Sequence, residues 1–512
     1  MAKFYLTTAI DYANGAPHLG HTLEKVGADC IVRYRRLRGD QVHFVMGMDE
    51  HGQKVAQAAE RAGLPPADWV ARISTAFEST WRTLDCSHDD WIRTTEPRHH
   101  ASVSEFLRRI QSRHPEDLTI GDYEGLYCVG CEEFKQEAQL EDGRCVEHPD
   151  LIPARMKERN HFFKLSRYGP QILELIQSGG FRVEPAIRRN EVIKVLEGGL
   201  EDVSISRARF PWGIPFPGDQ DHTVYVWFDA LINYLTAAGF PEPGWERLWP
   251  ADVHVIGKGI TRLHCCLWPA MLLAAELPLP RMVWAHGYVQ WEGLKVSKSS
   301  GGGVAVTVDT AIARHGPDAL RYFLLREVGF TGDGNFSWER FDERYTADLA
   351  DGLGNLVSRS LAMLAKYREG RVPSVPTGDS MLERAGLDAL RAYAEAMDRF
   401  DLRGGAEALG TLVSQANQYI VHTAPWKLAK EQQAEPLDVA LASLGRCLYR
   451  LAVLASPFLP GKAESIWHSL GKNGRAASSD WNGLTNPVFD APVSTQPPIL
   501  FPKLSAGTGE LS

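Results

Sequence analysis

A strand, a turn and a helix at the start of the chain constrain its fold more than any other feature. Residues 3–10 are apolar and rich in β-formers, residues 18–38 repeat apolar side chains at helical spacing, and residues 42–48 have the pattern of a second strand. A strand–helix–strand succession of this length favours a parallel sheet with a right-handed crossover. The turn contains His18-Leu19-Gly20-His21, which places two imidazoles at the amino end of the helix. Free backbone N–H groups and the helix dipole attract phosphate there, and both imidazoles can donate to phosphoryl oxygens.

A second phosphate-binding feature lies far downstream. Lys295-Val296-Ser297-Lys298-Ser299 precedes glycines at 301–303, a pattern that suits a mobile loop closing over a triphosphate. At the first feature, Gly20 has no side chain, so an adenine ring can lie against the backbone. Together the two features predict a site that holds ATP from two sides and joins a carboxylate to its α-phosphate. The chain has neither G-x-x-x-x-G-K-[ST] nor G-x-G-x-x-G, so a Walker-type NTPase and a dinucleotide dehydrogenase are both unsupported.

These features, in this order, resemble the signatures of the class I aminoacyl-tRNA synthetases. His18–His21 correspond to HIGH and Lys295–Ser299 to KMSKS, and a resemblance to the methionyl-tRNA synthetase family extends over nearly the whole chain. Further matching stretches are Ala13–His21, Met48–Gly52, Gly199–Arg207, Tyr225–Ala230, His286–Val289 and Ala424–Trp426. Two positions depart from the family: Val296 replaces the Met of KMSKS, and Val203 stands where some members carry Trp. Both KMSKS lysines are kept, whereas the pocket wall at Val203 is left open.

The resemblance implies a two-step reaction. The carboxylate of L-methionine attacks ATP, pyrophosphate leaves, and the methionyl-adenylate passes methionine to the 3′ end of tRNA(Met), including initiator tRNA. A carboxylate is already nucleophilic at neutral pH, so catalysis rests on positioning and on stabilising phosphoryl charge. His18 and His21 would donate to phosphate, Lys298 would be the chief cation, and Mg²⁺ would accompany the nucleotide. The residues implied for ATP are His18, Gly20, His21, Lys295, Ser297 and Lys298.

Methionine is flexible and weakly polar, so a site must select it largely by shape. By the resemblance, its side chain lies among Ile10, Tyr12, Trp227, Ala230, Leu231, Tyr234, Ile260 and His264. Asp49 would hold the α-ammonium group. Taken alone, such residues in strand-rich segments are typical of a core, and His264 is equally compatible with a buried histidine that only packs.

Two paired spacings predict a structural metal site. Cys128-x-x-Cys131 and Cys145-x-x-His148 supply three thiolates and one imidazole, which complete a tetrahedral shell for one Zn²⁺ and leave no open position. The segment falls where class I synthetases carry their connective insertion. Because this insertion is short, the large editing domains of the isoleucyl, valyl and leucyl relatives do not fit. The other cysteines, Cys30, Cys86, Cys265, Cys266 and Cys447, are expected to be buried reduced thiols that suit a reducing cytosol.

From about residue 345 the hydrophobic pattern of the sequence changes from strand-like runs to helical periodicity. Long amphipathic stretches at 346–368, 379–401, 403–422 and 435–457 predict a helix bundle. In the family this bundle reads the CAU anticodon, and Asn355, Arg359 and Trp426 match the residues that do so. Asn355 and Arg359 are one helical turn apart and share a face, and an exposed Trp can stack on a splayed base. Without the resemblance, the Arg would be a solvated residue and the Trp a packing residue.

The predicted fold class is α/β: a Rossmann-like parallel-sheet domain with an inserted zinc-knuckle connective domain, followed by an all-α anticodon-binding bundle. The sequence suggests these boundaries: 1–115 first half of the catalytic domain, 116–185 connective insertion, 186–290 second half, 291–345 KMSKS-loop region, 346–470 anticodon-binding bundle and 471–512 tail returning to the body.

Bulk properties add four expectations. The net charge of −9 and the pI near 6.0 do not indicate a general nucleic-acid binder, so tRNA would need a local basic track such as Arg33–Arg38 and Arg188-Arg189. No apolar run reaches the length of a membrane span, so no membrane association is expected. The amino end lacks the pattern of a targeting signal, which favours the cytoplasm. The chain stops before the dimerising OB-fold of many relatives, which predicts a monomer.

Alternative functions leave part of the sequence unexplained. Another class I synthetase would share the ATP site, but the short insertion disfavours the large aliphatic enzymes. A small nucleotidyltransferase would have no use for an anticodon bundle. A non-catalytic RNA-binding descendant should have lost the histidines or lysines of the two signatures, and all four are present. A zinc-knuckle binding module would account only for residues 128–148.

Overall fold

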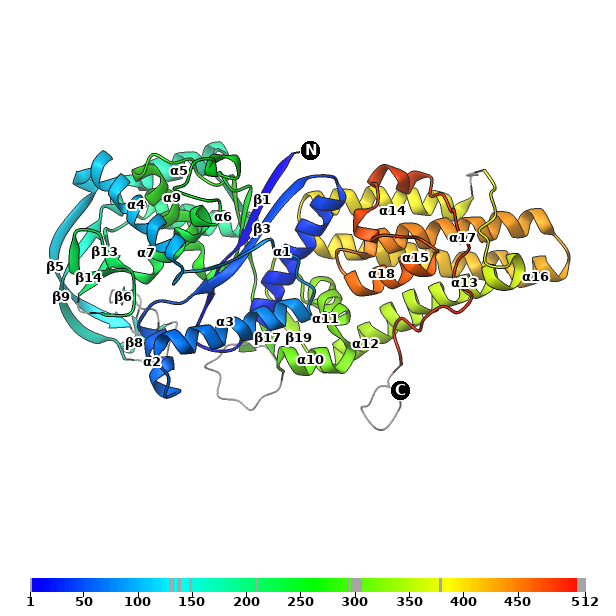
Figure 1. Cartoon of the computed structure of the whole chain (residues 1–512), viewed down its shortest axis with the longest axis horizontal. Coiled ribbons are helices and arrows are strands. Elements are labelled where there is room, and N and C mark those ends of the chain that lie inside the picture. The colour runs from blue at the N-terminus through cyan, green and yellow to red at the C-terminus, as the bar shows by residue number, and fades with distance from the viewer. Residues whose placement is uncertain are drawn as a thin grey trace.

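The chain forms two lobes, an α/β lobe with the amino terminus and an elongated helical lobe (Figure 1). The computed structural model describes residues 2–128, 130, 133–135, 140–146, 150, 152–208, 210–291, 294–295, 306–376 and 380–503. Four predicted site residues lie outside these ranges: Cys131, His148, Ser297 and Lys298. Within the described residues, no helix is both long enough and apolar enough to cross a bilayer.

A parallel sheet forms the centre of the first lobe. Its strands follow the order β10-β16-β15-β1-β3-β2, and β4 also pairs with β3. Their bounds are β1 (Lys3–Thr8), β2 (Asp11–Tyr12), β3 (Gln41–Asp49), β4 (Asp90–Arg93), β10 (Arg182–Glu184), β15 (Val253–Gly257) and β16 (Met282–His286). Helix α1 (Leu19–Leu37) links β1 to its parallel neighbour β3, so the predicted strand–helix–strand unit is confirmed.

Both faces of the sheet are covered, which explains why its strands are continuously apolar. Phe4 and Leu6 of β1 join one hydrophobic cluster with α1 and α3, whereas Tyr5 joins a second cluster with α4 and α9. The helices of this lobe are α2 (Gln53–Arg61), α3 (Pro66–Thr83), α4 (Pro97–Arg113), α5 (Gly169–Ser178), α6 (Ala186–Glu197), α7 (Val226–Leu231), α8 (Asn233–Thr236) and α9 (Trp268–Ala274).

The insertion is built on two long antiparallel strands, β5 (Leu118–Cys128) and β9 (Ala154–Phe163). They extend into a sheet of order β11-β9-β5-β6, beside a three-stranded sheet of order β12-β14-β13. The remaining strands here are β6 (Glu133–Lys135), β7 (Leu140–Glu141), β8 (Arg144–Cys145), β11 (Val203–Ser204), β12 (Ser206–Ala208), β13 (Pro215–Phe216) and β14 (Asp219–Val224).

A small sheet and short helices connect the two lobes. Strands β17 (Val289–Trp291), β18 (Leu294–Lys295) and β19 (Gly334–Phe336) pair in the order β18-β17-β19. Helices α10 (Val308–His315), α11 (Pro317–Phe323) and α12 (Trp338–Arg344) follow, and a π-helical stretch at 345–354 continues into the second lobe.

The second lobe is the predicted helix bundle. Figure 1 shows α13, α14, α15 and α17 running along it, with α16 at the far end. The bounds are α13 (Asn355–Arg368), α14 (Met381–Asp398), α15 (Leu402–Thr423), α16 (Pro425–Lys430), α17 (Ala434–Ala455) and α18 (Pro460–Ser469). The chain then returns over the bundle, and Leu500 and Phe501 are buried against it. The parallel sheet and the C-terminal bundle of the predicted fold class are therefore confirmed.

A buried arginine fastens the two lobes together. Arg321 of α11 donates to the Asp29 carboxylate of α1 (2.7 Å) and to the Pro457 carbonyl beyond α17 (2.8 Å). Arg321 and Asp29 are both fully buried, and Arg33 also donates to Asp29 at 2.7 Å. The helix that begins at His18 is thus tied directly to the bundle.

Candidate active site and tRNA-binding surface

His18 and His21 cap the amino end of α1. His18 Nδ1 accepts from the backbone N–H groups of Gly20 (3.1 Å) and His21 (3.4 Å), and His21 Nδ1 accepts from the backbone N–H of His18 (3.3 Å). The two rings stack with centroids 3.7 Å apart. Because each Nδ1 is an acceptor, a neutral imidazole carries its proton on Nε2. The cap therefore prepares two Nε2–H donors side by side, as a phosphate site requires.

This cap corrects one expectation from the sequence. The backbone N–H groups of Gly20 and His21 were expected to be free for phosphate, but both already donate to the His18 ring. The cap therefore favours the imidazoles, rather than these amides, as donors to an anion. Gly20 also has a steric role that the sequence did not suggest, since a Cβ there would lie 2.9 Å from His18 Cε1.

A buried ionic cluster lies behind the cap. Lys25 Nζ contacts Asp11 (2.8 Å), Glu24 (2.7 Å) and the Ala9 carbonyl (2.8 Å), and His286 Nε2 reaches the other oxygen of Glu24 at 3.0 Å. Burial opposes the charge on Lys25, but Asp11 and Glu24 raise its pKa above the usual value. The cluster fixes the ends of β1 and β16 against α1. Sequence reasoning missed it, although Glu24-Lys25 between the core residues Leu23 and Val26 was a visible signal.

Most of the predicted methionine-pocket residues contribute to one large hydrophobic cluster, and hydrogen bonds link Tyr234, His264 and Ile260 directly. Ile10, Tyr12, Trp227, Leu231, Tyr234 and Ile260 all belong to, or pack against, the same hydrophobic cluster. Ala230 and His264 are buried in the neighbouring turns, α7 and the π-helical stretch before α9. Tyr12 is the pairing partner of Asp49 between β2 and β3, so the carboxylate expected to hold the α-ammonium lies at this edge.

His264 is locked in one tautomer. Its Nδ1 lies 3.0 Å from the Ile260 carbonyl, which only accepts, so Nδ1 carries the proton and Nε2 accepts from the Tyr234 hydroxyl at 2.7 Å. Burial lowers the pKa of His264 to about 4, so the ring is neutral at physiological pH. A neutral, oriented imidazole provides a polar edge without placing a charge beside an apolar side chain.

A cavity of about 210 Å³ lies between the insertion and the catalytic sheet. Its walls include Arg207, whose guanidinium lies 4.2 Å from the ring centroid of Tyr225 and 5.5 Å from that of Tyr127. His51, 3.1 Å from the buried Asp229, also lines it, and burial lowers the pKa of His51 to about 4. His51, Arg207, Tyr225 and Asp229 lie in stretches that match the family, yet sequence reasoning gave them no role.

The structure describes only part of the KMSKS loop and of the zinc knuckle. Lys295 ends β18, whose backbone pairs with β17, and the rest of that signature lies outside the described residues. Cys128 and Cys145 are buried at the ends of β5 and β8. The five cysteines outside the knuckle are also buried and unpaired with one another, as expected.

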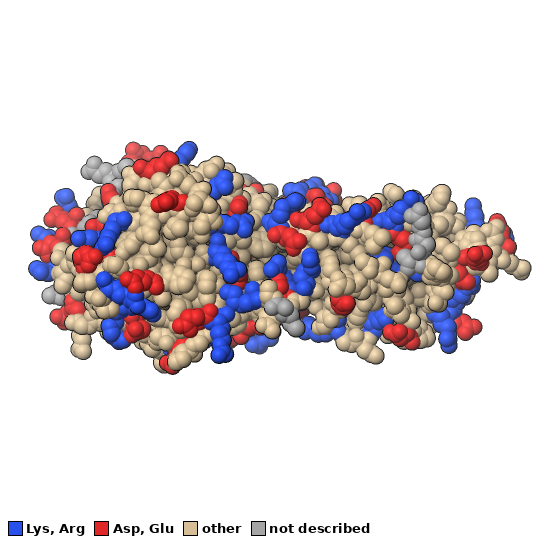
Figure 2. All heavy atoms as spheres, turned by 90° about the horizontal axis from the view of Figure 1, so that it is seen from above, with Lys and Arg blue, Asp and Glu red and all other residues tan. Residues whose placement is uncertain are grey.

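The three residues predicted to read the anticodon lie on α13 and α16, two helices that contact each other in the bundle. Asn355 is exposed at the start of α13, and Arg359 is half-buried one turn further. Trp426 is 42% exposed, so part of its ring faces solvent. In Figure 2, Lys and Arg side chains are frequent where the two lobes meet, and acidic side chains lie among them there and over the rest of this face.

Comparison with known proteins identifies both lobes. A sequence family described as tRNA synthetases class I (M) matches residues 4–149 and 136–361. The family described as the anticodon binding domain of methionyl tRNA ligase matches residues 375–510. The chain belongs to the methionyl-tRNA synthetase family. Its activity is therefore ATP-dependent ligation of methionine to tRNA, which confirms the prediction from the two signatures.

Individual relatives are similar over nearly the full chain. The methionine–tRNA ligase of Streptomyces coelicolor is 40% identical over 529 residues, spanning 98% of this chain and 96% of that protein. The ligase of Thermotoga maritima is 40% identical over 477 residues, spanning 91% and 75%. The solved structure of Mycobacterium tuberculosis methionyl-tRNA synthetase bound by methionyl-adenylate has a TM-score of 0.90 and 38% identity, and covers 98% of this chain and 100% of that one.

Proposed function

We propose that methionine activation takes place between the histidine cap of α1 and the pocket around Tyr234. The observation that carries this proposal is the pair of Nε2–H donors fixed by the cap, because phosphoryl charge needs pre-oriented donors. His18 and His21 donate to phosphate oxygens as pyrophosphate leaves. Lys298, supported by Lys295 and Ser297, stabilises the same charge from the opposite side, and Mg²⁺ neutralises the triphosphate.

Methionine lies along the predicted pocket. Asp49 at the end of β3 holds the α-ammonium, and the apolar walls include Trp227, Leu231 and Ile260. The Tyr234–His264 pair is held by its own hydrogen bonds, so the pocket keeps its shape when empty. A preformed apolar pocket selects a flexible substrate because it need not be reorganised on binding.

One Zn²⁺ joins the tip of the insertion through Cys128, Cys131, Cys145 and His148. The two described cysteines of this set are buried at the ends of β5 and β8, which suits an enclosed structural ion. Such a shell supplies only a cross-link, since no coordination position stays open. The fold therefore uses the ion for structure, and no chemical step passes through it.

The bundle reads the anticodon of tRNA(Met), including that of the initiator. Asn355 and Arg359 present donors and acceptors from one face of α13, and the exposed Trp426 ring offers a stacking platform. The buried free thiols suit a reducing cytoplasm. We take the enzyme to be a monomer, which sedimentation of the pure protein tests directly.

Two variants separate the proposed roles. Lys298→Ala should slow ATP–pyrophosphate exchange at least 100-fold, on the scale of losing one charge-stabilising donor, while methionine still binds. Trp426→Ala should leave exchange unchanged and slow tRNA charging, with a loss of about 1–3 kcal/mol for one stacked base. Unchanged exchange in the first variant would remove the role of Lys298. Normal charging in the second would remove the anticodon assignment.

A further inference from the structure

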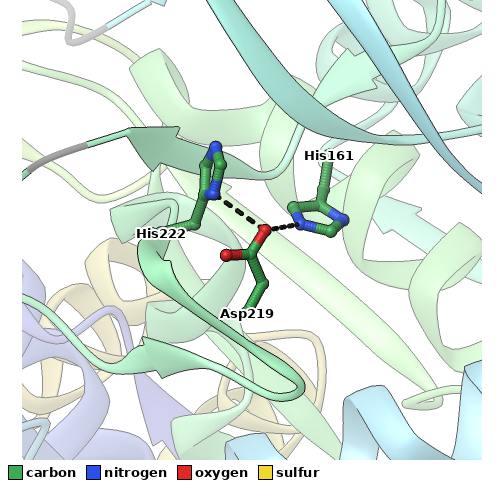
Figure 3. Close-up of side chains that lie close together, drawn as sticks. All are labelled: His161, Asp219 and His222. Atoms are coloured by element: carbon green, nitrogen blue, oxygen red, sulfur yellow. Dashed lines mark hydrogen bonds and ion pairs between the residues drawn. The ribbon is translucent and has the colours of Figure 1, made fainter.

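Two histidines and one aspartate converge where β9 of the insertion meets β14 (Figure 3). His161 comes from β9, whereas Asp219 and His222 come from β14. Asp219 Oδ2 lies 2.8 Å from His161 Nε2 and 2.9 Å from His222 Nδ1, and the three ligand atoms all lie within 4.8 Å of one another. None of the three side chains has a role in the proposed reaction.

The hydrogen bonds of His222 point to a missing positive charge. Its Nε2 lies 2.8 Å from the Arg159 carbonyl oxygen, which can only accept, so Nε2 carries a proton. In neutral His222 the lone pair is then on Nδ1, which faces a carboxylate oxygen. Among the described residues this buried Nδ1 has no hydrogen-bond partner of acceptable geometry. Two acceptors 2.9 Å apart repel each other unless a proton or a metal ion lies between or beside them.

The surroundings hold all three groups in orientations typical of metal ligands. A histidine ligand usually donates its second ring N–H to a carbonyl or carboxylate, as His222 does. The other carboxylate oxygen of Asp219 accepts from the Asp221 backbone N–H at 3.2 Å, which turns Oδ2 toward both imidazoles. The His161 ring stacks on Phe216 with centroids 4.0 Å apart. Rigid outer contacts of this kind lower the cost of assembling a metal site.

We propose that His161, Asp219 and His222 bind a divalent transition-metal ion, for which Zn²⁺ and Co²⁺ are the simplest probes. Two imidazoles and one carboxylate suit such borderline ions, whereas Mg²⁺ and Ca²⁺ prefer all-oxygen sites. Tetrahedral binding would separate neighbouring ligand atoms to about 3.3 Å, a widening of roughly half an ångström. The side chains are 12%, 29% and 14% exposed, so water can reach the fourth position.

The ion would cross-link the insertion to the hairpin that leads into the methionine pocket. β9 supplies one ligand and β14 supplies the other two, and β14 ends immediately before Tyr225 and α7, which carries Trp227. This second site is independent of the knuckle and does not depend on the proposed catalytic roles.

Metal stoichiometry tests the proposal on the full chain. Purified protein is titrated with Co²⁺, the bound metal is counted by elemental analysis, and the visible spectrum is recorded. Asp219→Asn and His222→Gln remove ligands with little change in shape, whereas Asp221→Asn alters an exposed residue of the same hairpin that contributes only its backbone. Cys145→Ser disrupts the knuckle and leaves the three proposed ligands in place, so it tests whether the two metal sites are separate.

We expect wild type and Asp221→Asn to bind one more equivalent of Co²⁺ per chain than Asp219→Asn and His222→Gln. The extra equivalent should show the bands of a nitrogen- and oxygen-ligated cobalt, without thiolate charge transfer, and should persist in Cys145→Ser. Equal stoichiometry in wild type and both ligand variants would overturn the proposal. So would loss of every bound equivalent in Cys145→Ser. Near-UV circular dichroism of each variant separates lost binding from lost folding.

Discussion

Replacing Arg321 with methionine should destabilise the junction between the two lobes. The guanidinium is fully buried and donates to Asp29 and to the carbonyls of Leu84 and Pro457, at 2.7, 3.0 and 2.8 Å. Methionine fills much of the volume but leaves the buried Asp29 with Arg33 as its remaining ion-pair partner among the described residues. Removing one partner of a buried ion pair costs about 3–5 kcal/mol, because the other charge stays buried.

Arg314→Met is the matched control. Its guanidinium also binds a carboxylate through two nitrogens, at Asp342, but the side chains are 38% and 33% exposed. Exposed pairs contribute about 0–1 kcal/mol, so this variant should unfold close to wild type. The assay is urea unfolding of both variants beside wild type, followed by fluorescence. A free-energy loss for Arg321→Met no larger than that for Arg314→Met would refute the reasoning.

Arg321→Met should also change how the free energy of unfolding depends on pH in the acid range. Burial alone would raise the pKa of Asp29, but Arg33 and Arg321 hold that pKa well below its usual value. A depressed carboxylate pKa contributes stability above the unfolded pKa of about 3.9, and this contribution is lost as the pH falls toward the folded pKa. Without Arg321 the pKa is depressed less, so the stability of Arg321→Met should decline less steeply below about pH 4.

Three further variants test the site and the knuckle. Gly20→Ala should reduce pyrophosphate exchange about tenfold or more, because the added Cβ displaces the His18 ring. Stability should not fall, since alanine favours a helix over glycine by about 0.5–1 kcal/mol. Unchanged exchange would contradict the role of the cap. Tyr234→Phe should raise KM for methionine and lower stability by about 1–3 kcal/mol, because His264 Nε2 loses its donor; an unaltered KM would argue against Tyr234 as a wall. Cys145→Ser should lose one zinc by elemental analysis, and retention of that zinc would remove this residue from the shell.

Local pattern in the sequence was enough to predict the framework of the enzyme. The strand–helix–strand unit around His18 and the bundle beyond residue 345 follow from periodicity, which short-range physics determines. The residues that join the lobes and support the site come together only in three dimensions. Asp29 and Arg321 are 292 positions apart, and His286 reaches Glu24 over 262 positions, so no local pattern could pair them.

The sequence also could not predict the solvent exposure of Trp426 or the hydrogen bonds that fix the histidine tautomers. Trp426 could have been a packing residue until its exposed ring was seen on α16. The assumption of free amides at the start of α1 was wrong because His18 caps them with its own side chain. Histidine at this position is an unusual cap, since Ser, Thr, Asp and Asn are preferred there, and composition alone gives no hint of it.

The most direct test of the account is ATP–pyrophosphate exchange, measured with Mg²⁺ and without tRNA across the standard amino acids. The account predicts exchange with methionine alone, because the histidine cap and the pocket around Tyr234 are formed without tRNA. Exchange with a different amino acid would overturn the pocket assignment while keeping the chemistry. Absence of exchange with every amino acid would contradict the central claim that this site activates methionine by itself.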